Sequence, residues 1–239
     1  MNVLAIIPAR GGSKSIPRKN IKLFNGFPLI AYSIAAAAES SRVSRIVCST
    51  DDEKIARIAT SYGADVPFIR PAPLSGDKVT DFPVIEHALI ELMKSGEEYD
   101  LVVHLRPTSP FRPPGLIDKA IKLMIEKDDC DSLRSMSKPL ENPFKMWQVK
   151  EGSAIPLIDL EMHESYNQPR QKLPEVYWHD GILDVIRTKT IFEKKSVTGD
   201  SVIPLITKRA YALDLDDLWQ WKHAEMWVEE SGLEYVSPE

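Results

Sequence analysis

The sequence predicts an α/β protein with a doubly wound, mostly parallel sheet and helices on both faces. The first 136 residues alternate short apolar runs with longer helical patterns, which is the order of elements in a parallel sheet. The first apolar run, Val3–Ile7, contains no polar residue and ends at Pro8, as expected of a strand that is buried on both faces.

Each element of this pattern has its own local signal. Pro28 suits the first turn of a helix that runs through the alanines to about Ser40. Thr50 or Asp51 can cap the helix after the second strand, and Gly63 suits the position just beyond its end. The strands expected in this region are Val3–Ile7, Arg45–Ser49, Val66–Ile69, Leu101–Leu105 and Ser132–Met136, with further helices at about 84–95 and 116–127.

The alternation fails between Ser137 and Val176, where proline, aromatic residues and methionine accumulate. We expect a single domain over residues 1–239, with an inserted arm at about 137–176 that leaves the sheet and returns. The apolar side chains of this arm are awkward for a monomer to hide, so the arm predicts a homodimer. The sheet should then resume with strands at 176–186 and 210–215, followed by a closing helix from Asp217 to about Ser231.

Composition and charge exclude several classes of protein. The net charge of −5 supplies no basic field for nucleic acid or an anionic membrane. Cys48 and Cys130 form no CxxC pair and are expected to be free thiols in a reducing compartment. No basic residue precedes the first apolar run, and no apolar stretch approaches the roughly 20 residues that span a bilayer. We therefore expect no signal peptide and a soluble, cytoplasmic protein.

Ligands of such sheets bind at the carboxyl ends of the strands. The loops at 10–20, 70–81 and 106–112, which follow the first, third and fourth expected strands, should therefore line one crevice.

The first of these loops has the composition of an anion site. Gly11 and Gly12 lie between Arg10 and Lys14, and Lys19 follows. Glycines at the end of a strand let the backbone offer N–H groups to an anion, and the cations supply charge. A solvated basic loop is the alternative. The spacings of the Walker loop and of G-x-G-x-x-G are both absent, so the loop predicts a nucleotide site of another kind.

The segment PARGGSKSIPRKN resembles the signature of the nonulosonate cytidylyltransferases, the family that includes the CMP-sialic acid synthetases. That signature reads arginine, two residues, Gly-Ser-Lys, two residues, proline, one residue, Lys-Asn. Its fixed positions are filled by Arg10, Gly12, Ser13, Lys14, Pro17, Lys19 and Asn20. Further segments resemble the family in order along nearly the whole chain, namely STDDEKIA, RPTSPFR, YNQPRQKLP and LDLDD.

The resemblance implies a Rossmann-like fold of the nucleotidyltransferase type and a defined reaction. In that reaction the anomeric hydroxyl of a 2-keto-3-deoxy sugar acid attacks the α-phosphate of CTP and releases pyrophosphate. Phosphoryl transfer of this kind depends mainly on positioning and on neutralising charge. The residues expected to hold the nucleotide are Arg10, Gly12, Ser13, Lys14, Lys19, Asn20 and Arg70, and those expected to act in catalysis are Arg10, Lys19, Asp214 and Asp216.

Asp214 and Asp216 are the expected Mg²⁺ ligands. Side chains repeat every second residue along a strand, so both carboxylates should point the same way at the end of the strand expected at 210–215. Two carboxylates together with phosphate oxygens suit Mg²⁺, which also lowers the pKa of a bound hydroxyl. In the alternative interpretation, Asp216 or Asp217 caps the closing helix, and the two roles can coexist on neighbouring aspartates.

The acceptor carries a carboxylate and therefore needs a cation. Arg170, in NQPRQ, resembles the family's sugar-binding arginine, and Lys145 and Gln168 are expected beside it. For Lys145 and Arg170, a position that faces solvent or a partner subunit is the alternative. The full set of residues expected to bind the acceptor is Arg106, Thr108, Lys145, Gln168, Arg170 and Asp180.

Two positions depart from the family pattern. Arg106 stands where the family has a glutamine before P-T-S-P, and Asp180 stands where it has an asparagine before glycine. The two changes indicate either a compensating charge pair or a different substituent on the sugar, so N-acetylneuraminic acid, legionaminic acid and the deaminated Kdn all stay open as acceptors.

Two other functions are weighed against this one. A cytidylyltransferase for Kdo or 8-amino-Kdo is disfavoured by the YNQPRQ segment. A non-catalytic nucleotide-sensing module is disfavoured because both Asp214 and Asp216 are present.

Overall fold

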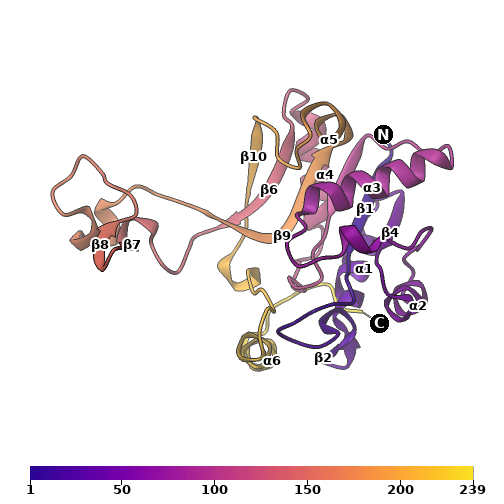
Figure 1. Cartoon of the computed structure of the whole chain (residues 1–239), viewed down its shortest axis with the longest axis horizontal. Coiled ribbons are helices and arrows are strands. Elements are labelled where there is room, and N and C mark those ends of the chain that lie inside the picture. The colour runs from indigo at the N-terminus through magenta and orange to yellow at the C-terminus, as the bar shows by residue number, and fades with distance from the viewer. Residues whose placement is uncertain (239) are drawn as a thin grey trace.

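A computed structural model of the chain describes residues 1–238. Its centre is a six-stranded sheet in the order β10-β6-β9-β5-β1-β4, with helices on both faces (Figure 1). The strands of this sheet are β1 (Val3–Pro8), β4 (Arg45–Ser49), β5 (Leu101–His104), β6 (Ser132–Ser137), β9 (Trp178–Arg187) and β10 (Val202–Ile206). The expected α/β class with a mostly parallel sheet is confirmed, because only β9 runs antiparallel to its neighbours β5 and β6.

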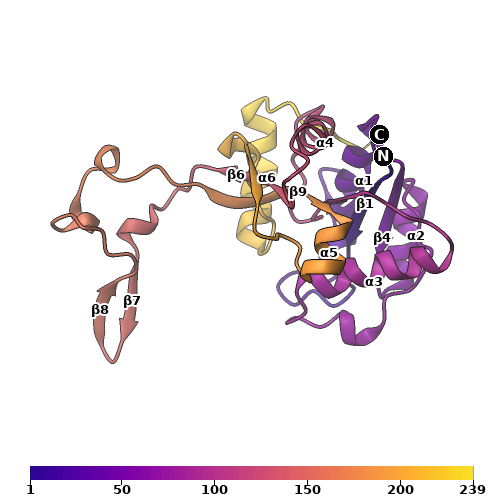
Figure 2. The same ribbon diagram turned by 90° about the horizontal axis from the view of Figure 1, so that it is seen from above.

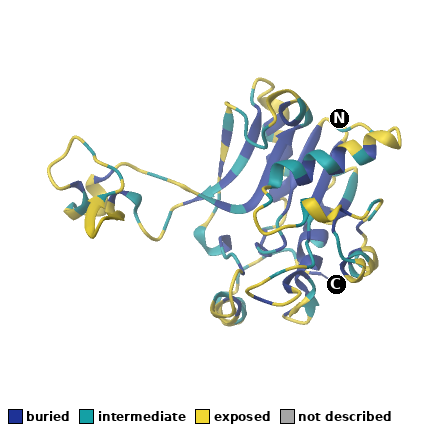
Figure 3. Cartoon of the chain, viewed as in Figure 1, coloured by how far each residue is buried: buried dark blue, intermediate teal, exposed yellow. Residues whose placement is uncertain are grey.

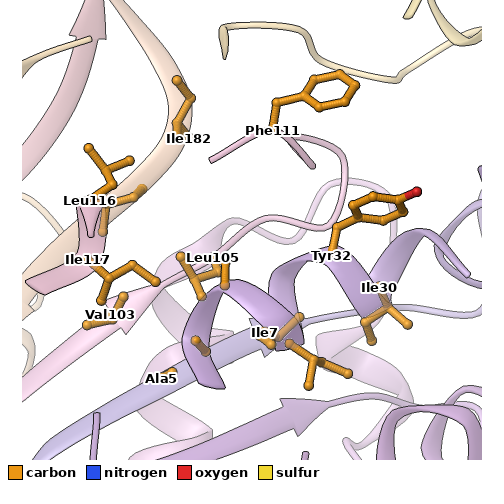
Figure 4. Close-up of a cluster of buried hydrophobic side chains, with 14 of the residues drawn as sticks. Ala5, Ile7, Ile30, Tyr32, Val103, Leu105, Phe111, Leu116, Ile117 and Ile182 are labelled. Carbon is orange, nitrogen blue, oxygen red and sulfur yellow. The ribbon is translucent and has the colours of Figure 1, made fainter. Parts of the chain in front are cut away.

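Two buried clusters attach the helices to the sheet. One cluster holds side chains of α1, α2, α4 and α6, and the other holds those of α3 and α5. Figure 4 shows part of the first cluster, where Ala5 and Ile7 of β1 and Val103 of β5 pack beneath Ile30 of α1 and Ile117 of α4. The α-helices are α1 (Leu29–Glu39), α2 (Glu53–Ser61), α3 (Asp81–Lys94), α4 (Leu116–Glu126), α5 (Thr188–Lys194) and α6 (Leu218–Ser231).

Short elements connect these units. The 3-10 helices are η1 (Lys19–Ile21), η2 (Ala72–Leu74), η3 (Pro143–Lys145), η4 (Ser165–Asn167), η5 (Arg170–Lys172) and η6 (Arg209–Tyr211). Strands β2 (Leu23–Phe24) and β3 (Phe27–Pro28) form a small hairpin before α1. None of the helices in residues 1–238 combines the length and the apolar character needed to cross a membrane.

Two of the expected strands are wrong. Residues 66–69 form no strand, and the only pairing there is an isolated bridge between Val47 and Asp65. Residues 210–215 form no strand either, because the chain makes the 3-10 turn η6 and then runs to α6 with a single backbone hydrogen bond to the loop after β5, from the N–H of Leu215 to the carbonyl of Thr108. The last strand of the sheet is instead β10, which the sequence prediction missed together with α5.

The start of α2 also differs from the prediction. Asp52, not Thr50 or Asp51, is the cap, because its carboxylate accepts hydrogen bonds from the N–H groups of Lys54 and Ile55 at 2.8 and 3.1 Å. Asp51 is left free for another partner.

The segment between β6 and β9 projects away from the sheet in two perpendicular views (Figures 1 and 2). At its end lies the antiparallel hairpin of β7 (Trp147–Lys150) and β8 (Ser153–Pro156). Glu151 and Gly152 connect its strands, both with positive φ (50° and 79°), which is the backbone of a tight hairpin turn. Most of this segment is exposed, whereas β1 and β5 at the middle of the central sheet are buried (Figure 3).

Candidate active site

A cleft of about 530 Å³ lies at the carboxyl ends of β1 and β5. Its walls come from the first loop, from the segment that leads into α3 and from the loop after β5, so the three loops expected to share a crevice do so. Asp216 joins them from the segment before α6. Of the residues expected to hold a nucleotide, those that line the cleft are Arg10, Ser13, Lys14, Lys19, Asn20 and Arg70.

Two aspartates after β4 fix the glycine turn of the first loop. The N–H of Gly11 donates to Asp51 Oδ1 at 2.9 Å. A Cβ on Gly11 would lie 2.9 Å from the Cβ of Asp52, which is closer than real contacts allow, so this position requires glycine. Gly12 has open space around it, and its backbone is therefore free to approach a ligand. Asn20 braces the same loop by donating from Nδ2 to the carbonyl of Arg10 at 3.0 Å.

Asp77 pairs with two of the expected phosphate-binding cations. Its carboxylate lies 2.6 Å from Arg10 Nη1 and also forms an ion pair with Lys14. The hydrogen bonds from Lys14 and then Arg10 hold the pKa of Asp77 below its usual value. The sequence analysis did not identify this residue, because a single aspartate in a polar loop gives no motif.

Arg70 is a buried cation in the cleft wall. Its side chain is only 3% exposed, its Nε donates to Ser75 Oγ at 3.2 Å, and its Nη2 lies 3.9 Å from Asp51 Oδ1. Burial lowers the pKa of Arg70, and the charge of Asp51 opposes that shift. Asp51 therefore contacts both the glycine turn and the buried arginine.

Of the two expected metal ligands, Asp216 lines this cleft and contacts the first loop, whereas Asp214 does not line it. Lys19 Nζ lies 2.6 Å from Asp216 Oδ1, and the hydroxyl of Ser15 donates to the backbone carbonyl of Asp216. Asp217, and not Asp216, caps α6, in a capping box with Gln220. The capping role that the sequence left open thus belongs to Asp217, and the side chain of Asp216 takes no part in it.

Asp214 fits a cation ligand on an observation independent of its motif. Its Oδ1 is buried and has no hydrogen-bond partner. Burial, and then the charge of Asp216, raise the pKa of Asp214 above its usual value, although a hydrogen bond with Thr108 and then the charge of Lys19 oppose this. A bound cation would relieve both the burial and the repulsion. Within residues 1–238 no three His, Cys, Asp or Glu side chains gather as a metal site, so the remaining ligands would have to be phosphate oxygens or water.

Arg106 and Thr108, two of the expected acceptor residues, line the cleft. Arg106 does not pair with Asp180, so the charge pair considered from sequence is not formed. Arg106 instead donates from Nη1 to Asp184 at 2.9 Å and from Nη2 to Asp81 at 2.7 Å. Burial lowers the pKa of Arg106, but Asp184 and then Asp81 outweigh it and the net shift is upward.

The position of Asp180 has a local cause. It lies in a bulge of β9, between the paired positions Arg134↔Asp184 and Met136↔His179. Its buried carboxylate accepts from Ser135 at 2.5 Å and from Thr207 at 2.6 Å. It is therefore bonded inside the fold and does not line the cleft.

The remaining acceptor candidates, Lys145, Gln168 and Arg170, lie on the projecting arm and not at the cleft of their own chain. Arg170 Nη2 donates to the carbonyl of Leu140 at 2.6 Å, and Gln168 Nε2 donates to that of His163 at 3.0 Å. One chain alone does not bring them to the nucleotide residues.

A glycine turn rich in cations that meets an acidic segment at one crevice of an α/β sheet is the arrangement of a nucleotidyltransferase. The family model described as cytidylyltransferase matches residues 4–217, so the chain belongs to the cytidylyltransferase family and is an enzyme of that class.

Curated relatives agree with this assignment. The chain is 35% identical to the CMP-N,N'-diacetyllegionaminic acid synthase of Legionella pneumophila, over 96% of this chain and 97% of the relative. It is 32% identical to a pseudaminic acid cytidylyltransferase of Campylobacter jejuni, over 95% and 96% of the two chains. It is 34% identical to the N-acylneuraminate cytidylyltransferase of Escherichia coli, over 90% of this chain and 49% of the relative. The resemblance seen in the sequence motifs is thereby confirmed.

Solved structures confirm the fold. A CMP:2-keto-3-deoxy-manno-octonic acid synthetase in complex with CTP superposes with a TM-score of 0.71, at 14% identity over 97% of this chain and 100% of the other. The 4-diphosphocytidyl-2C-methyl-D-erythritol synthase of Anaerococcus prevotii gives a TM-score of 0.64, at 12% identity over 96% and 99% of the two chains.

Proposed function

We propose that the protein transfers CMP from CTP to the anomeric hydroxyl of a nine-carbon 2-keto-3-deoxy sugar acid. The hydroxyl oxygen forms a bond to the α-phosphorus, the bond between that phosphorus and the bridging oxygen breaks, and pyrophosphate leaves. The observation that carries the proposal is the Lys19–Asp216 contact, because it brings the first loop and one of the two expected metal ligands to one cleft. The relatives are named for legionaminic, pseudaminic and N-acylneuraminic acids, and these names favour this acceptor class over Kdo.

The first loop is proposed to hold the triphosphate. Arg10 can bind phosphate oxygens in a bidentate way, whereas Lys14 and Lys19 act as point charges. The open backbone at Gly12 and Ser13 adds N–H donors. Because Asp77 pairs with Arg10 and Lys14 in the free protein, the triphosphate has to displace this carboxylate when it binds.

Asp214 and Asp216 are proposed to hold Mg²⁺ beside the phosphates. When bound, the cation neutralises charge on the phosphate oxygens and lowers the pKa of a nearby hydroxyl. Lys19 remains next to Asp216 and keeps the carboxylate in place. The support for this site is the buried, unpartnered Oδ1 of Asp214.

The arm is proposed to act on a second copy of the chain in a homodimer. Arm side chains such as Val149 (77% exposed) and Ile155 (46% exposed) leave apolar surface uncovered within their own chain. An arm that reached a partner's cleft would bring Lys145, Gln168 and Arg170 to the acceptor. The use of CTP and the two free thiols, Cys48 and Cys130, favour a cytoplasmic location.

The test is pyrophosphate release from CTP and Mg²⁺ with a panel of N-acetylneuraminic acid, Kdn, legionaminic acid, pseudaminic acid and Kdo, with product mass determined. We expect release with at least one nine-carbon acid and a product that has the mass of its CMP conjugate. Release with Kdo alone would replace the proposed acceptor class, and no release with any acid would refute the reaction.

A further inference from the structure

Three neighbouring strands place polar side chains in a row across one face of the sheet. In the register of β5, β9 and β6, His104 lies opposite Asp184, and Asp184 lies opposite Arg134. Strands β6 and β9 lie side by side in the part of the sheet from which the arm emerges (Figure 1). His179 and Arg106 reach the same carboxylate from either side. We call Asp184, His104, Arg106, Arg134 and His179 the Asp184 cluster.

Asp184 is the buried centre of this cluster, with 2% of its side chain exposed. His179 Nε2 lies 3.0 Å from its Oδ1, and Arg106 Nη1 lies 2.9 Å from its Oδ2. Burial alone would raise the pKa of Asp184, but the hydrogen bond from His179 and the charge of Arg106 hold it below its usual value. Asp184 is therefore ionised at neutral pH, and both of its oxygens are already engaged.

The cluster contains more donors than its acceptors can satisfy. Arg134 Nε is buried without a hydrogen bond and stands 3.6 Å from Asp184 Oδ1. His104 is 1% exposed, and neither of its ring nitrogens has a partner. Buried polar groups are almost always paired in native proteins. His104 and Arg106 line the cleft, and Arg134, whose side chain is 22% exposed, stands beside the same carboxylate on the neighbouring strand.

The charges of the cluster determine what kind of group it can accept. Burial, and then Arg106, lower the pKa of His104 to about 4, so its ring is neutral at pH 7. Arg106 and Arg134 are balanced by Asp184 and by Asp81, which accepts from Arg106. A donor-rich site whose formal charges cancel suits a neutral oxygen, such as a hydroxyl or the carbonyl of an acylamino group, better than a second carboxylate.

We propose that the Asp184 cluster is the subsite that distinguishes acceptor sugars by a neutral, oxygen-bearing substituent. Arg134 is the residue that contacts this substituent, and Asp184 is the positioning residue that holds Arg106 and Arg134 toward it. The inference rests on the proposed function, since it takes the acceptor to be a sugar acid. In this subsite Asp184, and not Asp180, is the partner of Arg106. The subsite also includes Arg134 and His179, which no sequence motif marks.

The experiment compares wild type with Arg134→Gln and Arg134→Lys on acids that carry acylamino groups (N-acetylneuraminic and legionaminic acid) and on Kdn, which carries a hydroxyl. We expect Arg134→Gln to change the ratio of kcat/KM between the two kinds of acid by about tenfold, the effect of one hydrogen bond to a charged group. The KM for CTP should stay within about twofold of wild type, because the change affects acceptor binding alone. Arg134→Lys should restore part of the wild-type ratio.

Asp184→Asn tests the positioning role. It should raise the KM for the acceptor and leave the KM for CTP unchanged, whereas a purely structural defect would lower the melting temperature and affect both substrates. The matched control is Arg45→Gln, because Arg45 is a strand arginine of similar side-chain exposure (27% against 22% for Arg134) that pairs with Asp65 and Glu97 outside the cleft. Its acceptor ratio should equal that of wild type.

The outcomes distinguish a failure of the proposed subsite from a failure of the proposed reaction. An active wild type with an unchanged acceptor ratio in folded Arg134→Gln would overturn the subsite and leave the cytidylyltransferase reaction standing. An equal change of the ratio in Arg45→Gln would also overturn it, because the effect would then not be local. A wild type that is inactive with every acid would remove the proposed function and the subsite together.

Discussion

Lys19 and Asp216 are separated by 197 positions in the chain, yet Lys19 Nζ lies 2.6 Å from Asp216 Oδ1. The lysine is largely buried, with 11% of its side chain exposed, while the aspartate is 64% exposed. The less mobile partner therefore belongs to the loop after β1, and the segment before α6 is held against it. This contact joins two walls of the cleft, because both residues line it.

Asp214→Asn is expected to abolish turnover but to stabilise the free protein. Loss of a cation ligand should lower kcat by at least about 100-fold, while CTP binding through the first loop stays measurable. Burial raises the pKa of Asp214 in the folded state. The folded protein therefore keeps its full stability below the unfolded pKa of this carboxyl, and it loses stability as pH rises through the folded pKa. The variant's gain in melting temperature should therefore be larger at pH 7 than at about pH 4, close to the unfolded pKa.

Asp216→Asn is the control for this effect, because Asp216 is exposed and paired with Lys19. It should lose Mg²⁺-dependent turnover without any gain in melting temperature. If Asp214→Asn turned over CTP at the wild-type rate, Asp214 would have no place in the metal site.

Asp77→Asn is expected to tighten CTP binding a few-fold. Removal of its charge frees Arg10 and Lys14 from a partner that competes with the triphosphate, and exposed ion pairs of this kind are weak. Titration calorimetry with CTP measures the change. Asp65→Asn, which removes an exposed carboxylate paired with Arg45, should have no effect, and weaker binding by Asp77→Asn would show that Asp77 supports the loop and does not compete.

Gly11→Ala and Gly12→Ala form a pair of adjacent substitutions with different expected effects. A methyl group at Gly11 meets the Cβ of Asp52 at 2.9 Å, while a methyl group at Gly12 meets nothing within 4 Å. We expect Gly11→Ala to lower stability by about 1–3 kcal/mol, as overpacking does, and Gly12→Ala to change it little. Urea unfolding measures both, and equal losses would contradict the tight approach of Asp52.

Mixing two inactive variants tests whether the arm completes a partner's site. Arg170→Gln should lose activity through its arm, and Asp214→Asn through its cleft. In a mixed dimer one cleft has intact Asp214 and receives an intact arm, so activity should return when the variants are unfolded and refolded together. Refolding each variant alone is the control. No recovery in a mixture shown to contain mixed dimers would mean that each arm serves its own chain or none.

Much of the fold and of the nucleotide loop could be predicted from local signals. The loop after β1 combines strand, glycines and cations in one continuous segment, so its residues reach one cleft by chain connectivity alone. The relation of Arg106 to Asp184 could not be predicted, because it depends on an antiparallel β9 and on a bulge that turns Asp180 inward. Local patterns do not specify strand direction or bulges.

The errors in the last third of the chain have a similar cause. The segment before Asp214 has the composition of a strand but finds no partner, and β10 was missed because Pro204 lies at its centre. Proline is tolerated in strands mainly at the edge of a sheet, and β10 is the edge strand next to β6.

The proline of β10 also affects whether two molecules of the protein can associate through the edge of the sheet. An edge strand presents unpaired backbone groups to which a strand of another molecule can bind, and this is a common start of aggregation. Pro204 has no N–H to offer, and it interrupts the edge in the middle of a strand of five residues. Association through this side of the sheet is thereby discouraged, whereas the two strands of the projecting hairpin stay almost wholly exposed.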